Sequence, residues 1–198
     1  MFNEKSSPVY SGSFFYCQPI QIFQLISIYF GIFQFCLKMA TYFKTMDSPI
    51  GVLKLSSDER YLKSISFDAE FIEIELDIPE ILLVAQKQLE EYFSGSRQQF
   101  DLPIDPEGTE FQHRVWMQVV AVGYGFTKSY VEIARGVKSE NSSRAVGMAN
   151  GRNPLPIIIP CHRIIGHNGK LTGYAGGLDR KKWLLLHELQ NSGKSGLF

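Results

Sequence analysis

The stretch LPIIIPCHRIIG, residues 155–166, organises the rest of the chain. Its β-branched apolar run ends at Pro160 and predicts a buried strand that stops directly before Cys161. A cysteine at a strand end would sit on rigid backbone. The adjacent His162 is the side chain best suited to lower a thiol's pKa or to carry its proton near neutral pH. The alternative is a buried structural cysteine, since free cysteines are among the most buried residues.

Composition sets the first limits. The chain has 198 residues, of which 44% are hydrophobic, and this is enough for one domain or two small ones with a core. Three cysteines, Cys17, Cys36 and Cys161, are too few and too scattered for a disulfide framework or a zinc site. We therefore expect reduced thiols in an intracellular compartment, and neither a metal nor a cofactor.

The net charge of zero conceals two halves of opposite sign. From Asp47 to Glu110 there are 15 acidic against 5 basic residues, whereas from Lys128 to Lys182 there are 10 basic against 3 acidic residues. The basic half also holds Cys161. Such segregation suits a polyanion such as nucleic acid, although chance clustering on solvated faces would look the same.

Residues 1–38 differ in character from the remainder of the chain. The segment from Phe14 to Leu37 is strongly apolar, yet glutamines interrupt it and no basic segment precedes it. We expect an extension foreign to the fold, with translation starting normally at Met39. A membrane anchor or a signal peptide is the alternative.

Residues 39–105 predict a small α+β domain. Residues 41–45, 51–55 and 62–67 alternate as short antiparallel strands do. Pro79 opens a predicted helix through Phe93, and residues 100–104 suit a further edge strand.

Residues 106–191 predict a helical domain, followed by a loose tail at 192–198. Thr109 is expected to cap a helix through Ala121, and Ser129 to cap a helix over 130–137 with Glu132 three residues later. A tight polar turn then leads to a second short helix, so the pair predicts a helix-turn-helix.

Small residues recur in that second helix, at Ala145, Gly147 and Ala149. They would permit close approach to a groove wall or, equally, tight packing against another helix. The glycine-rich segment 171–177 lacks the spacing of a phosphate-binding loop and better suits close approach to a flat ligand. Asp179 is expected to cap the final helix.

Together these residues resemble the O6-alkylguanine-DNA alkyltransferases, also called methylated-DNA–protein-cysteine methyltransferases. The resemblance spans Phe111 to Glu188 with its spacing intact and is loose before Pro103. It rests on Ser129-Tyr130, Arg144-Ala145-Val146-Gly147, Asn153-Pro154, Ile159-Pro160-Cys161-His162-Arg163, Gly173-Tyr174, Gly176-Gly177 and Trp183-Leu184-Leu185 with Glu188.

The resemblance implies an α+β fold, with a small ribonuclease H-like antiparallel-sheet domain before a helical domain that holds the helix-turn-helix and the cysteine. It implies repair of O6-alkylguanine, and also of O4-alkylthymine, by one irreversible transfer of the alkyl group to Cys161. His162 would activate the thiol through a water and Glu188 would orient His162, as in a nucleophile–base–orienter triad. Asn153 would brace the turn around the cysteine.

The same resemblance implies a partner, double-stranded DNA, which the helix at 143–151 would enter through the minor groove. The target base must be flipped out of the stack to reach a buried thiol. Arg144 would fill the gap and Tyr130 would help to rotate the nucleotide. Ala145, Gly147 and Ala149 would line the groove, and a pocket at Ile164, Tyr174 and Ala175 would hold the base. The implied protein is a monomer without a cofactor, cytoplasmic, or nuclear in a eukaryote.

Two other classes use part of the pattern. A helix-turn-helix regulator would leave the Cys-His-Glu set idle, whereas a thiol hydrolase would use Cys161 and His162 with turnover. A lesion-binding relative without transfer carries another residue in place of Cys161.

Overall fold

The computed structural model of the chain describes residues 41–67, 70, 78–138 and 143–193. The predicted extension at 1–38 and most of the predicted tail lie outside these residues.

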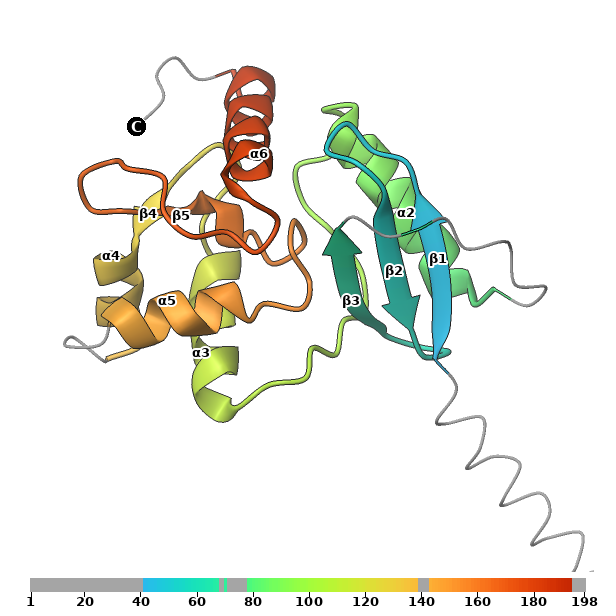
Figure 1. Ribbon diagram of the computed structural model, residues 1–198. Coiled ribbons are helices and arrows are strands. Elements are labelled where there is room, and N and C mark those ends of the chain that lie inside the picture. The colour runs from blue at the N-terminus through green and yellow to red at the C-terminus, as the bar shows by residue number, and fades with distance from the viewer. Residues whose placement is uncertain (1–40, 68–69, 71–77, 139–142, 194–198) are drawn as a thin grey trace, which may run out of the picture. The chain divides into compact units, whose positions relative to one another are not determined.

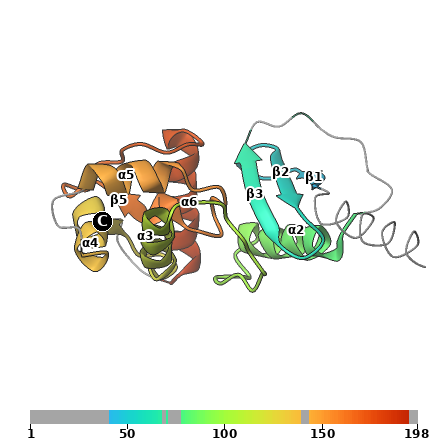
Figure 2. The same ribbon diagram turned by 90° about the horizontal axis from the view of Figure 1, so that it is seen from below.

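An antiparallel sheet forms the first part, as predicted. Its strands β1 (Tyr42–Met46), β2 (Leu53–Ser57) and β3 (Leu62–Phe67) lie in the order β1-β2-β3. Helix α2 (Glu80–Phe93) begins directly after Pro79 and packs on one face of the sheet (Figures 1 and 2). The strands bury alternating leucines and isoleucines against the apolar stripe of α2, which explains why a short sheet is stable here.

The predicted edge strand at 100–104 is wrong. One isolated parallel bridge, Leu62 to Ile104, is formed instead. Gln88 of α2 accepts a hydrogen bond from the Asp101 amide and donates one to its carbonyl, so this backbone is satisfied by a helix side chain rather than by a strand.

Three helices then pack together: α3 (Glu110–Val120), α4 (Tyr130–Gly136) and α5 (Ser143–Gly151). Both predicted N-caps are confirmed, because Thr109 with Gln112 and Ser129 with Glu132 each form a complete capping box. The turn between α4 and α5 includes residues 139–142, which lie outside the described part of the chain.

Helix α6 (Leu178–Asn191) closes the second part, and a short parallel pair links β4 (Lys128–Ser129) to β5 (Ile164–Ile165). The predicted cap at Asp179 is wrong by two residues. Gly177 precedes the helix with φ 86°, a conformation that glycine adopts without steric strain, and Asp179 lies in the first turn.

The predicted strand before Cys161 is also wrong. Residues 155–159 form turns with one bridge, Pro156 to Ile159, and Cys161 opens the 3-10 turn η1 (Cys161–Arg163). Ile157 has φ 75° and is fully buried, a rare conformation for a β-branched residue. A five-residue apolar run is compatible with a buried strand and with a buried turn, so the pattern alone does not distinguish them.

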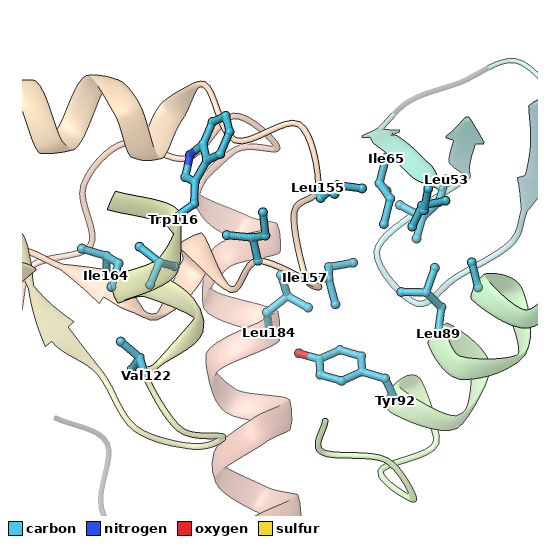
Figure 3. Packing of buried hydrophobic residues seen from close by; sticks show 14 of the residues in the cluster. Leu53, Ile65, Leu89, Tyr92, Trp116, Val122, Leu155, Ile157, Ile164 and Leu184 are labelled. Carbon is cyan, nitrogen blue, oxygen red and sulfur yellow. The ribbon is translucent and has the colours of Figure 1, made fainter. Parts of the chain in front are cut away.

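The sheet part and the helical part share one hydrophobic core. Leu53, Ile65 and Leu89 from the first part belong to the same cluster as Ile157 and Leu184 from the second (Figure 3). The amide of Ile65 also donates a hydrogen bond to the Pro154 carbonyl at 2.8 Å. The turn that precedes Cys161 is therefore held by contacts with both parts of the chain.

Candidate active site

Cys161 is held by its own backbone. Its amide donates to the Ile159 carbonyl at 2.7 Å, and its carbonyl accepts from Asn150 Nδ2 at 3.2 Å. Asn150 belongs to the last turn of α5, so the candidate DNA-binding helix and the cysteine are joined directly. The side chain is buried, with 4% of the residue exposed.

Asn153 organises the turn in front of the cysteine. Its Nδ2 donates to the Ile159 carbonyl at 2.7 Å and its Oδ1 accepts from the Leu155 amide at 2.9 Å. These bonds close the loop across Ile157 and hold that residue in its left-handed conformation. Buried strain of this kind persists only where the surroundings determine the backbone.

The surroundings of Cys161 favour the neutral thiol. Burial raises the pKa of Cys161 to about 11, although a hydrogen bond from Asn153 and the charge of Lys181 act in the opposite direction. At neutral pH the resting side chain is therefore a thiol. Any nucleophilic reaction at this sulfur needs a base that removes its proton.

The adjacent His162 is the candidate for such a base. Its Nε2 lies 2.8 Å from Glu188 Oε1, and burial lowers the pKa of His162 despite this carboxylate. The imidazole is thus neutral. Because a carboxylate only accepts hydrogen bonds, Nε2 carries the hydrogen and Nδ1 keeps its lone pair. Nδ1 is buried, and among the described residues it has no hydrogen-bond partner.

Glu188 accepts hydrogen bonds on both of its oxygens. Its Oε1 accepts from the Tyr92 hydroxyl, His162 Nε2 and Arg163 Nη2, all within 2.9 Å. Its Oε2 accepts from Arg163 Nε at 2.9 Å and from the Gly125 amide at 3.1 Å. His162 and Arg163 hold the pKa of Glu188 well below its usual range although burial opposes this, so the side chain is a carboxylate.

The predicted DNA-contacting residues differ in exposure. Arg144 is exposed near the start of α5, and Tyr130 opens α4 with its hydroxyl 3.4 Å from the Thr172 carbonyl. Ala145 and Gly147 are half-buried, and Gly147 faces the Tyr130 ring.

Ala149 does not fit the predicted groove-lining role. It is only 3% exposed, and its carbonyl accepts a hydrogen bond from Trp116 Nε1 at 2.9 Å. Its small side chain serves the packing of α5 against α3, which is the alternative that the sequence left open.

The predicted pocket residues differ in the same way. Ala175 is exposed, whereas the Ile164 side chain is buried and its carbonyl already accepts from Lys181 Nζ at 2.6 Å. The half-buried Tyr174 packs its ring against Phe67 of β3, with centroids 5.9 Å apart. The sheet part thus supports the glycine-rich segment.

Sequence reasoning missed the buried Lys181 and Tyr92 and assigned no chemical role to Arg163. Lys181 Nζ donates to the carbonyls of Ile164 and Thr172, and burial lowers its pKa to about 8. A signal for Lys181 existed: it lies seven residues before Glu188, on the same helix face. No such signal marks Tyr92, because its contact lies 96 residues away.

Two kinds of site are not found among the described residues. The described residues contain no group of three or more His, Cys, Asp or Glu side chains placed to hold a metal ion. None of their helices is both long and apolar enough to cross a membrane.

Comparisons with known families cover both parts of the chain. The family described as 6-O-methylguanine DNA methyltransferase, DNA binding domain, matches residues 110–190, and its ribonuclease-like domain matches residues 41–106. The chain belongs to the methylated-DNA–protein-cysteine methyltransferase family.

Individual relatives of this methyltransferase agree over most of their length. One from Methanosarcina acetivorans is 48% identical over 149 residues, which cover 73% of this chain and 96% of that protein. One from Mycolicibacterium paratuberculosis is 44% identical and covers 76% and 93%. Both are named methylated-DNA–protein-cysteine methyltransferase.

Solved structures of the family share the fold of this methyltransferase. The crystal structure of the Mycobacterium tuberculosis O6-methylguanine methyltransferase is 41% identical with a TM-score of 0.70, and covers 79% of this chain and 97% of that one. A structure of the M. tuberculosis protein in complex with DNA is 43% identical with a TM-score of 0.69, and covers 75% and 93%. The predicted α+β fold class is therefore confirmed.

Proposed function

We propose that this methyltransferase repairs DNA by moving the alkyl group of O6-alkylguanine, and of O4-alkylthymine, onto its own Cys161. The observation that carries this proposal is the buried thiol beside a neutral imidazole whose Nε2 is fixed by an ionised Glu188. This set matches the nucleophile, base and orienter of other activated nucleophiles.

The transfer is one displacement. His162 Nδ1 takes the thiol proton through a water, and the sulfur electron pair forms a bond to the alkyl carbon. The bond between that carbon and O6 breaks with its electron pair on guanine, which takes up one proton. The proton lost by Cys161 thus balances the proton gained by guanine, and the alkyl group stays on the protein as a thioether.

Several neighbours tune this step. Asn153 and Lys181 both stabilise the thiolate as it forms, since each lowers the pKa of Cys161. Lys181 is well placed for this because two backbone carbonyls fix its ammonium group. Arg163 keeps Glu188 ionised, and the carboxylate in turn favours the Nε2–H tautomer of His162.

The base must reach the sulfur from duplex DNA, so we assign the minor groove to α5. Arg144 is exposed there and would fill the vacated stack, while Tyr130 at the start of α4 would guide the flipped nucleotide. Ala145 and Gly147 leave room for the groove wall. We place the activity where the DNA is, in the cytoplasm, or in the nucleus of a eukaryote, and expect the protein to act as a monomer without a cofactor.

Mass spectrometry tests the proposal. After incubation with duplex DNA containing O6-methylguanine, the intact protein should gain one methyl group, and the added mass should map to the peptide holding Cys161. Cys161→Ser should bind the same DNA and transfer nothing. Repeated turnover per chain would favour the hydrolase, and label on another residue would exclude Cys161 as the acceptor.

A further inference from the structure

Tyr92 links the sheet part of the chain to the candidate active site. It lies in the last turn of α2, is fully buried, and donates its hydroxyl hydrogen to Glu188 Oε1 at 2.9 Å. Figure 3 shows this hydroxyl directed away from α2, toward the helix that carries Leu184. A residue of the first part therefore contacts the carboxylate that orients His162.

The position of this hydroxyl is set from several sides. The Tyr92 carbonyl accepts a hydrogen bond from His187 Nε2 at 2.7 Å, so α6 holds the residue at its backbone as well as at its side chain. The ring contacts those of His187, Phe100 and Tyr124, with centroids 5.3 to 6.1 Å apart. Burial raises the pKa of Tyr92 well above its ordinary value, so the hydroxyl keeps its hydrogen and donates.

Tyr92 and His162 bind the same oxygen of Glu188. Oε1 accepts from Tyr92, His162 and Arg163, and a carboxylate oxygen offers about two lone-pair directions. These bonds therefore constrain one another in direction and strength. We propose that Tyr92 is a positioning residue for alkyl transfer, which fixes Glu188 and through it the imidazole of His162. The proposal rests on the proposed function of this site.

Loss of the hydroxyl should have two effects on His162. Glu188 would gain rotational freedom, so Nδ1 would face the sulfur for a smaller fraction of the time. Oε1 would also retain more negative charge, which favours the protonated imidazole. The neutral base would then be available only at higher pH.

Other charged and titratable groups define the background for this shift. Groups on α6 and η1 act on His162 directly, whereas groups on α2 and on the loop after α3 act on it through Glu188. These groups are Glu188, Lys181, Cys161, Arg163, Tyr92 and Tyr124. The Tyr92→Phe substitution removes one hydroxyl and leaves every charge in this set and the ring packing unchanged.

The test is a single-turnover rate measurement from pH 5 to 9 on the full chain, with Tyr92→Phe against wild type. Substrates are duplex DNA containing O6-methylguanine and the free base O6-benzylguanine. We expect Tyr92→Phe to slow both transfers about tenfold at pH 7, the effect of a lost bond to a charged group. The acidic limb of its rate profile should also move to higher pH.

Leu89→Ala is the matched control. Leu89 is fully buried one turn earlier in α2, and its aliphatic side chain has no polar group to offer Glu188. Leu89→Ala should lower the melting temperature more than Tyr92→Phe does, yet leave the acidic limb in place when assayed below its melting range.

The outcomes separate the two proposals. A slower Tyr92→Phe with a shifted limb supports the positioning role. An unchanged rate, or a slower rate with an unshifted limb as in a packing defect, overturns it while wild-type transfer upholds the proposed function. No transfer by wild type on either substrate contradicts the proposed function itself.

Discussion

At the scale of single residues, Arg144 differs from Cys161, His162 and Glu188 because it is exposed, whereas those three are buried. Its proposed task concerns DNA alone. It would fill the space that the flipped base leaves, whereas Cys161 and His162 would act on whatever substrate reaches them. A duplex and a free base therefore separate the two tasks.

We expect Arg144→Ala to reduce transfer from duplex DNA by roughly 30-fold, since holding a base out of the stack is worth a few kcal/mol. Transfer from free O6-benzylguanine should stay nearly unchanged. Single-turnover rates on the two substrates provide the measurement, and Arg152→Ala, which changes an exposed arginine just beyond α5, is a control of equal charge. Equal losses on both substrates would place Arg144 in folding or in the pocket.

Sequence and structure agree unequally on these residues. The family resemblance implied roles for Cys161, His162 and Glu188, and the structure brings His162 and Glu188 into contact. Tyr92 could not be found in this way, because it acts through a contact with another part of the chain. For Lys181 the sequence offers only its position on the same helix face as Glu188, since its contacts are with distant backbone. A lysine beside a second lysine on a helix ordinarily indicates a solvated face.

At the scale of elements, the N-caps of α3 and α4 were predictable because a capping box involves only four consecutive residues. The turn at 155–159 was not, since its conformation depends on the side chain of Asn153 and on burial against both parts of the chain. Local signals predicted local structure, and tertiary contacts decided the rest.

The cap of α4 has a functional consequence, because Tyr130 is the first residue of that helix. Ser129→Ala should lower the free energy of unfolding by about 1 kcal/mol. It should also slow transfer from duplex DNA severalfold, because fraying of the first turn displaces Tyr130. Chemical denaturation and duplex transfer rates measure the two effects.

Thr109→Ala removes the equivalent cap from α3 and is the control for Ser129→Ala. It should cost a similar amount of stability without slowing duplex transfer. A loss of transfer in both variants would show that stability alone, and not the position of Tyr130, limits the reaction.

At the scale of the whole molecule, the buried network makes the fold sensitive to acid. The pKa of His162 lies below its ordinary value of 6.5 and that of Glu188 well below 4.5, so the unfolded chain binds more protons than the folded one as the pH falls. Stability should decline from about pH 6.5 and more steeply below 4.5, by up to about 1.4 kcal/mol per pH unit for each proton.

Denaturation midpoints at about pH 7.5, 6, 5 and 4 measure this decline. His162→Gln should flatten the part of the profile just below the ordinary imidazole pKa, because no imidazole remains to be protonated on unfolding. A wild-type profile that stays level from neutral pH to about pH 4 would contradict the protonation states assigned to the site.

A shortened chain that begins at Met39 should retain full transfer activity and thermal stability. The two matched family domains cover residues 41–106 and 110–190, and the shared core is built from residues within these ranges. Transfer rates and melting curves of the shortened and full-length proteins should coincide. A shortened protein that is insoluble or inactive would make residues 1–38 part of the fold.

The donors around Glu188 discriminate between side chains of equal size. Glutamine matches glutamate in shape, but its NH2 group would have to point either at the Arg163 Nε and Gly125 amide or at the donors on the other side. In either orientation the amide N–H groups of glutamine would face buried N–H or O–H donors, which would be left without an acceptor. The position thus selects for a double acceptor and not for volume, so an isosteric amide would be among its worst replacements.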